Sequence, residues 1–131
     1  MPTVSIRTPL ESNLPNSVQV ELDIFSGRPN PFWALDNTQF SDLRERVTAL
    51  VRSPCRSLTA ALGYRGLVVQ WVQSGQARQL RVQRGIVEVT TGSDMACFED
   101  SQRAVERWLF ATGKPSLNVD LVAQVERHWQ R

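Results

Sequence analysis

Hydrophobic and polar residues alternate strictly between Ser17 and Phe25. The apolar positions of this stretch are Val18, Val20, Leu22 and Ile24. A period of two is typical of a strand with one buried face, so we predict a half-buried strand here. The glycine and the two prolines of Ser26–Pro31 then end the strand, because these residues favour turns.

The spacing of apolar residues next changes to that of a helix. Asp36 and Gln39 have the pattern of a capping box, and Leu35 with Phe40 has the spacing of a hydrophobic staple. The expected buried face comprises Phe40, Leu43, Val47 and Leu50. Because Pro54 disfavours helix at the residue before it, the helix is expected to end near Arg52.

Three short β-like stretches follow, separated by glycine-containing turns. They are Gly66–Gln73, Arg78–Gln83 and Ile86–Thr90. Ser74-Gly75-Gln76 and Arg84-Gly85 are typical hairpin turns, which predicts a β-meander. The polar stretch Thr91–Ser93 is expected to close it.

Two helices are expected at the end of the chain. Asp100 can cap the first, whose inner positions are Ala104, Val105, Trp108, Leu109 and Thr112. Gly113 is a natural residue just beyond a helix, and Pro115 prevents its continuation. Ser116 or Asn118 can cap the second helix. The inner face of that helix is Val122, Val125 and Trp129.

The predicted order is therefore β-α-β-β-β-α-α in the α+β class. Each strand has one apolar face, so we expect a four-stranded, mainly antiparallel sheet with three helices packed on one face. The opposite face would carry Gln19, Glu21, Asp23, Gln79, Arg81 and Gln83. Residues 1–16 contain three prolines and are interpreted as an extended arm, with residues 17–131 as a single domain.

Composition narrows the class of protein. The chain has 131 residues, 41% hydrophobic and 21% charged, which disfavours disorder and coiled coil. No apolar run approaches the length of a membrane span, and the first residues do not resemble a secretory signal. A net charge of +2 is too small to indicate nucleic-acid binding unless the charges are segregated. The oligomeric state stays open.

Cys55 and Cys97 are the only cysteines, and a disulfide between them is possible. Two separate buried thiols are the favoured interpretation, with a reducing compartment and a cytoplasmic location. Two cysteines and one histidine cannot supply four metal ligands without carboxylates, so no metal site is predicted. No cofactor is predicted either.

The loop 25–33 is the best candidate for a binding site. Gly27 permits a positive φ, and the two prolines of the loop stiffen the backbone. Arg28 and Asn30 would then be displayed on a rigid loop, with Phe32 and Trp33 as anchors in the core. The alternative is a stiff connector without a function, in which Arg28 pairs with Asp23 or with a backbone carbonyl.

A second block, Leu62-Gly63-Tyr64-Arg65-Gly66, has glycines that suggest a bulge or a close backbone approach. This geometry could direct Tyr64 and Arg65 toward the first loop, although a plain strand entry explains the block equally. The complete predicted binding set is Ser26, Gly27, Arg28, Asn30, Trp33, Tyr64 and Arg65.

These blocks carry a resemblance. The stretch Phe-Ser-Gly-Arg-Pro-Asn-Pro-x-Trp, then Leu-Gly-Tyr-Arg-Gly, and then Trp108-Leu109 with Thr112-Gly113 resemble a set of small uncharacterised microbial proteins. The similarity spans roughly Glu21 to Gly113, and the nonapeptide is its most specific part. No activity is attached to that set, so the resemblance supports the choice of site and implies no reaction.

The function expected from these observations is a non-enzymatic binding module for a protein, a peptide or a small anionic ligand. The first alternative is RNA or DNA binding through Arg78, Arg81 and Arg84, which strand alternation places on both faces of the sheet. The second is a small hydrolase or lyase that uses Asp23 and Arg28. The only histidine, His128, lies near the C-terminus and is a poor general base, and no catalytic residue or membrane partner is predicted.

Overall fold

The computed structural model describes residues 17–55 and 63–130. These residues form a seven-stranded antiparallel sheet, three α-helices and two short 3₁₀ turns, which confirms the α+β class. The predicted arm, residues 1–16, lies outside the described residues. No helix within the described ranges combines the length and the apolar character needed to cross a membrane.

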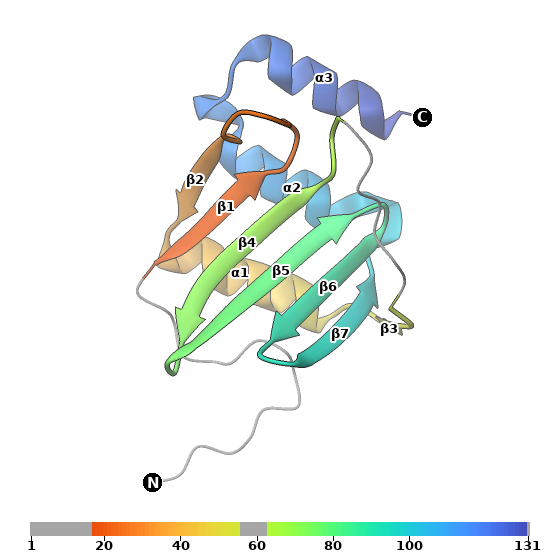
Figure 1. Ribbon diagram of the computed structural model, residues 1–131. Helices are drawn as coiled ribbons and strands as arrows, with labels where there is room; N and C mark the ends of the chain where they lie inside the picture. The colour runs from red at the N-terminus through yellow and green to blue at the C-terminus, as the bar shows by residue number, and fades with distance from the viewer. Residues whose placement is uncertain (1–16, 56–62, 131) are drawn as a thin grey trace, which may run out of the picture.

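Figure 1 shows the elements in chain order. The strands are β1 (Val18–Leu22), β2 (Phe32–Leu35), β3 (Arg52–Ser53), β4 (Leu67–Gln73), β5 (Gln76–Gln83), β6 (Ile86–Thr91) and β7 (Asp94–Glu99). The helices are α1 (Asn37–Thr48), α2 (Ala104–Gly113) and α3 (Val119–Trp129), with 3₁₀ turns η1 (Ser101–Arg103) and η2 (Lys114–Ser116). The spatial order of the strands is β2-β1-β4-β5-β6-β7-β3, and every neighbouring pair is antiparallel.

The prediction of four strands is wrong, because β2, β3 and β7 add to them. β2 follows two prolines and has only four residues, so its pairing with β1 depends on tertiary contacts and leaves no local pattern. β7 begins with the exposed pair Asp94 and Met95 and lacks regular alternation. β3 is only two residues long and pairs with β7.

Helix ends follow the predicted caps in part. Asp36 and Gln39 form the capping box of α1, as predicted. The helix ends at Thr48 and not near Arg52, because Arg52 pairs with Phe98 as part of β3. Asn118 caps α3 by accepting from the backbone N–H of Asp120 at 2.8 Å.

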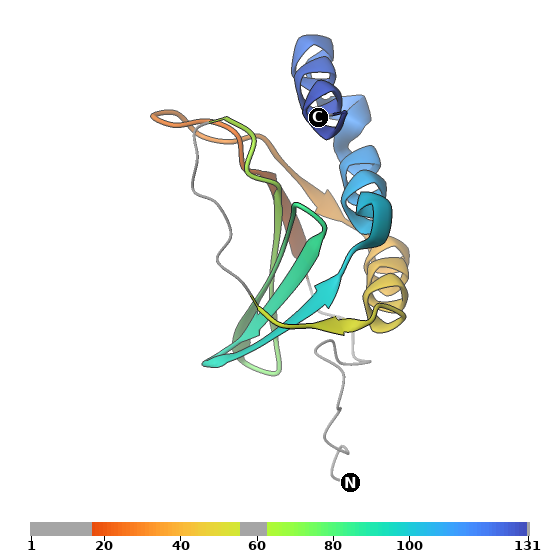
Figure 2. The same ribbon diagram turned by 90° about the vertical axis from the view of Figure 1, so that its right-hand side faces the viewer.

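α1, α2 and α3 lie on the same side of the sheet, and α3 stands at one end of it (Figure 2). The inner sheet face supplies Val20, Leu22, Leu67, Val69, Leu80, Val82 and Val87, all fully buried. α1 closes the core with Phe40, Leu43 and Val47. On the outer face Gln19, Gln70 and Gln79 lie side by side across three strands. The predicted polar outer face is therefore present, although Gln83 within it is only 2% exposed.

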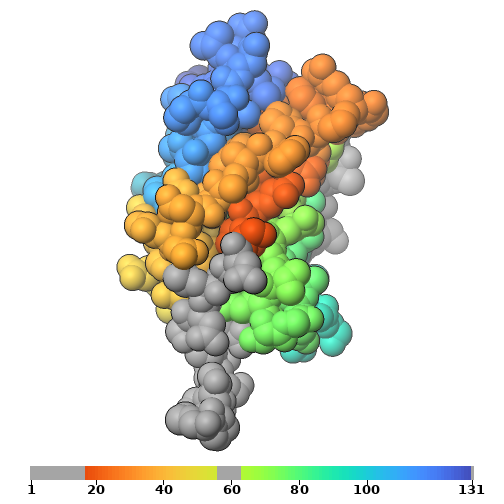
Figure 3. Space-filling model, turned by 90° about the vertical axis from the view of Figure 1, so that its left-hand side faces the viewer, coloured from red at the N-terminus to blue at the C-terminus, as the bar shows by residue number. Residues whose placement is uncertain are grey.

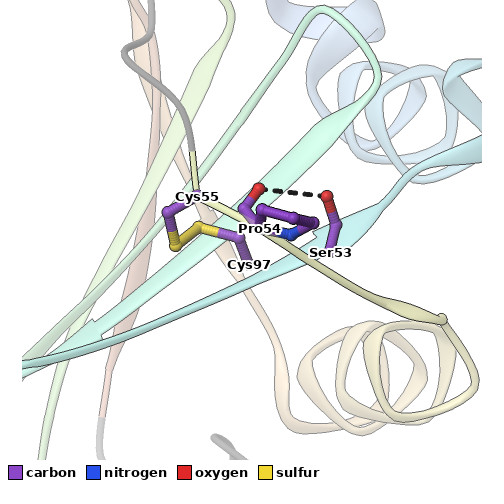
Figure 4. The surroundings of a disulfide bond; sticks show 4 residues. All are labelled: Ser53, Pro54, Cys55 and Cys97. Atoms are coloured by element: carbon purple, nitrogen blue, oxygen red, sulfur yellow. Dashed lines mark hydrogen bonds between the residues drawn. A yellow bond between two sulfur atoms is a disulfide. The ribbon is translucent and has the colours of Figure 1, made fainter.

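A disulfide joins Cys55, just after β3, to Cys97 in β7 (Figure 4). The prediction of two separate thiols is wrong: β3 pairs Ser53 with Cys97, and this pairing carries Cys55 to within 5.2 Å of Cys97, measured between Cα atoms. A strand of two residues leaves no sequence signal that would have revealed this proximity. Disulfides persist mainly in oxidising compartments. The cysteines therefore no longer support a reducing compartment, and the cytoplasmic location stays a prediction.

Candidate functional site

The loop between β1 and β2 is closed at its base by the side chain of Asn30. Its Oδ1 accepts from the backbone N–H groups of Ile24 at 3.0 Å and Phe25 at 2.7 Å. Its Nδ2 donates to the carboxylate of Glu21 at 2.7 Å. The main chain adds a bond from the Leu22 N–H to the Pro31 carbonyl at 2.9 Å. Asn30 therefore stabilises the loop and is not displayed for a ligand.

Asp23 lies at the centre of an ion-pair network beneath this loop. Arg65 donates to Oδ1 of Asp23 through Nε at 3.1 Å and through Nη2 at 2.8 Å. Arg81 donates to Oδ2 at 3.0 Å. Burial alone would raise the pKa of Asp23, but hydrogen bonds and charge from the two arginines outweigh it and hold the pKa below its usual value.

Arg65 also donates to the Phe25 carbonyl at 2.9 Å, so it fastens the loop to the start of β4. The next residue, Gly66, has a φ of +91°, and a Cβ there would lie 2.2 Å from the Val82 carbonyl oxygen. Only glycine permits this approach of the backbone to β5. The glycine block thus directs Arg65 toward the first loop, as predicted, while the function of Arg65 here is structural.

Arg28 is the only cationic residue of the loop 25–33, and it projects outward. Its guanidinium stacks on the Phe25 ring, 3.8 Å from the centroid. In residues 17–55 and 63–130 no hydrogen bond or ion pair of this guanidinium is found, so the predicted alternative of a pair with Asp23 is wrong. Ser26 and Gly27 lie exposed beside it, and Gly27 has a φ of +83° at the tip.

A cleft of about 490 Å³ separates this loop from η2 and the first turns of α3. Figure 3 shows the loop and α3 as neighbouring projections at one end of the molecule. The loop contributes Phe25, Arg28 and Pro31, and the opposite wall is formed by Ser116, Leu117, Asn118, Asp120, Leu121 and Gln124. The cleft thus combines an aromatic-stacked arginine, apolar side chains and an aspartate.

Trp33 and Tyr64 do not line the cleft; their side chains anchor the fold instead. Trp33 packs against Gly113 and donates from Nε1 to Oγ1 of Thr112 at 2.8 Å. Gly113 is the last residue of α2 and has a φ of −104°, so the prediction that it lies just beyond the helix is wrong, and packing explains the glycine. Phe32, in contrast, is 65% exposed and does not anchor the loop, contrary to the prediction.

The prediction that the glycine block directs Tyr64 toward the first loop is wrong, because the Tyr64 hydroxyl lies in a buried cluster around Glu106. Oε2 of Glu106 accepts from the Tyr64 hydroxyl, from Nε1 of Trp129 at 2.9 Å and from Arg103 at 3.4 Å. The Glu106 side chain is fully buried, and its Oε1 has no hydrogen-bond partner. Burial raises the pKa of Glu106, against opposing hydrogen bonds and the charge of Arg103. Burial and the adjacent Glu106 raise the pKa of Tyr64 as well.

This cluster joins the start of β4 to α2 and to the end of α3. The ring of His128 lies edge-on against Tyr64, with centroids 5.1 Å apart. Asp100 completes the surroundings by accepting from the backbone N–H groups of Val105 and Glu106, and burial raises its pKa. Asp100 was predicted to cap this helix; the N-cap position of α2 is Arg103 instead, because η1 lies between, but the Asp100 carboxylate still binds two N–H groups of the first turn.

The structure therefore divides the predicted binding set. Asn30 and Arg65 meet at Asp23, Trp33 packs on α2, and Tyr64 lies with Glu106. Only Ser26, Gly27 and Arg28 remain exposed. Sequence reasoning missed both the α3 wall of the cleft and Glu106. Glu106, Phe110 and Gly113 share a buried stripe of α2, so a carboxylate within an apolar stripe was the available signal.

The alternatives gain no support from the geometry. Arg78 is only 7% exposed and lies on the helix side of the sheet beside Trp71, Arg81 pairs with Asp23, and Arg84 lies at an exposed turn. They form no continuous basic surface. Asp23 and Arg28, which the hydrolase hypothesis combines, lie in different surroundings: Asp23 pairs with Arg65 and Arg81, whereas Arg28 lines the cleft.

A larger hollow of about 740 Å³ lies chiefly on the outer sheet face. Its lining mixes three glutamines and Thr90 with apolar residues such as Trp71 and Val72, and its single charged residue is the buried Arg78. It lacks an exposed charged group that could orient a ligand, so the cleft at Arg28 is the better candidate. Among the described residues no group of His, Cys, Asp or Glu side chains is placed to hold a metal ion.

Comparisons with known proteins add no further guide to the site. No family model, no curated protein and no solved structure matches this chain. The resemblance to small uncharacterised microbial proteins accordingly stays a prediction.

Proposed function

We propose that this protein is a non-enzymatic binding module that holds a carboxylate of a protein or peptide partner in the cleft between the 25–31 loop and α3. The observation that carries the proposal is Arg28: its guanidinium is stacked on Phe25, lines the cleft and makes no hydrogen bond to a described residue. Arginine binds carboxylates through two parallel hydrogen bonds, and stacking on an aromatic ring orients it without using its N–H groups.

The stiffness of the loop supports the same proposal. Asn30 closes its base, and Arg65 joins it to the start of β4. A loop that is ordered before binding loses little conformational entropy when a partner docks. The residues that the sequence suggested as ligand contacts thus contribute indirectly, by holding Arg28 in place.

The surroundings favour a polypeptide over a small anion. Pro31, Leu117 and Leu121 supply apolar surface within the cleft. Val119, which begins α3 next to it, is 77% exposed. Apolar side chains beside an arginine are typical of the central part of a protein interface.

A peptide array with acidic and neutral sequences tests the proposal. It is screened with the wild type, with Arg28→Ala and with Arg28→Lys, and binding of selected peptides is measured by calorimetry. Arg127→Ala is the matched control, because it removes an exposed arginine of α3 that does not line the cleft.

We expect Arg28→Ala to weaken binding by about tenfold or more, because it removes charge-assisted hydrogen bonds. Arg28→Lys should restore binding only partly, since an ammonium cannot bind a carboxylate through a planar fork. Equal affinities of wild type and Arg28→Ala for every selected peptide would refute the proposed function.

A further inference from the structure

A second charge faces the same cleft from the opposite wall. Asp120 lies in the first turn of α3, is exposed and lines the cleft together with Arg28. Its backbone N–H is bound by Asn118, while no hydrogen bond or ion pair of its carboxylate is found within the described ranges. Asp120 and Arg28 are not paired with each other either, because no ion pair of 4.0 Å or less joins them.

A carboxylate in the first turn of a helix is favoured by the helix dipole, which accounts for Asp120 in α3. It does not account for an arginine and an aspartate on facing walls of one cleft without an ion pair between them. Two opposite, unpaired charges on facing walls of a cleft would favour a ligand that carries both complementary charges. A simple anion would be attracted by Arg28 and repelled by Asp120, so the aspartate discriminates against it.

We infer that the segment recognised in this cleft carries a basic side chain beside its acidic group, with the carboxylate on Arg28 and the cation on Asp120. This inference rests on the proposed function and adds the chemistry of the ligand. Leu117 and Leu121 lie on the wall that carries Asp120, where the aliphatic stem of a lysine or arginine can pack. Gln124 offers an amide to the peptide backbone on the same wall.

Synthetic peptides in an alanine-rich background test the inference. One series contains a glutamate and a lysine at every spacing from adjacent to several residues apart; two further series contain the glutamate alone or the lysine alone. Each is measured against the wild type, Asp120→Asn and Arg28→Ala. Asp94→Asn is the matched control, because Asp94 is exposed at the start of β7 and does not line the cleft.

The wild type should bind the best glutamate–lysine peptide about tenfold more tightly than the glutamate peptide. Asp120→Asn should abolish this preference by weakening the mixed peptide, and it should leave or improve binding of the glutamate peptide. Asp94→Asn should behave as the wild type. Thermal unfolding of each variant shows whether the fold is retained.

Two results would overturn the inference. The first is that Asp120→Asn prefers the mixed peptide over the glutamate peptide as strongly as the wild type does. If Arg28→Ala still weakens binding in that case, the proposed function stands and only the inferred basic group of the ligand is refuted. The second is that free leucine, a zwitterion, competes with the mixed peptide and binds as tightly as that peptide does. This result would identify the cleft as a site for a small molecule. If Arg28→Ala has no effect on any peptide, the proposed function itself fails.

Discussion

The indole of Trp33 lies directly on Gly113: a Cβ at Gly113 would lie 2.2 Å from Cε2 of Trp33. In an ordinary helix a glycine-to-alanine change stabilises by about 1 kcal/mol. Here the added methyl must displace the ring, so we expect Gly113→Ala to lower the free energy of unfolding by about 1–3 kcal/mol, as measured by urea denaturation. In a Trp33→Leu background the same change should cost much less. A cost that is identical in both backgrounds would contradict the contact.

The ion-pair network at Asp23 predicts that the stability of the fold depends on pH in the acid range. Asp23→Asn leaves Arg65 and Arg81 partly buried without their counter-charge, and we expect a loss of about 1–3 kcal/mol at neutral pH. Because the folded pKa of Asp23 is lowered, its contribution is present above the usual aspartate pKa and is lost as pH falls through the folded value. Urea unfolding of both proteins at descending pH measures this.

Asp42→Asn is the control for this network, because Asp42 forms an exposed pair with Arg46 within α1. Its cost should stay below about 0.5 kcal/mol at every pH. If the two asparagine variants lose equal stability, the network at Asp23 contributes nothing beyond a surface ion pair.

The buried Glu106 predicts the opposite dependence of stability on pH. Its folded pKa is raised, so its contribution to stability is fully present below the pKa of the unfolded chain and is lost as pH rises through the folded value. The advantage of wild type over Glu106→Gln should therefore shrink from about pH 4 upward. Denaturation curves across this range measure the difference, with Glu126→Gln at an exposed pair as control. Parallel curves for wild type and Glu106→Gln would contradict the prediction.

The disulfide should contribute strongly to stability. It joins residues 42 apart, and a cross-link of this span is expected to add about 2–4 kcal/mol by restricting the unfolded chain. Urea unfolding with and without a reducing agent measures this contribution. Alkylation followed by mass spectrometry should label two thiols only after reduction; labelling of Cys55 and Cys97 in the untreated, freshly isolated protein would show that the bond does not form.

Local patterns predicted the elements whose signals are local. The alternation in β1, the capping box at Asp36 and the cap at Asn118 all follow from side chains within a few residues of each other. β2 was missed, because its place in the sheet depends on Trp33 reaching α2 about eighty residues later. The disulfide was missed for the same reason, since it depends on the pairing of β3 with β7.

The candidate site, too, was predicted only where its signal is local in the sequence. The loop was identified from its own residues, but the wall formed by α3 is distant in sequence and had no local signal. Asn30 was interpreted as a ligand contact, although short amide side chains commonly bond the backbone of their own loop, which is what it does.

The disulfide also determines whether the fragments produced by a protease can separate. The chain that it encloses, between Cys55 and Cys97, includes β4, β5 and β6, and the turn between the last two carries the exposed Arg84. Trypsin cleavage after Arg84 would leave one cysteine in each product, so the two pieces would remain a single covalent molecule. Such a nicked protein would have the mass of the intact chain plus one water, and it would separate into fragments only after reduction.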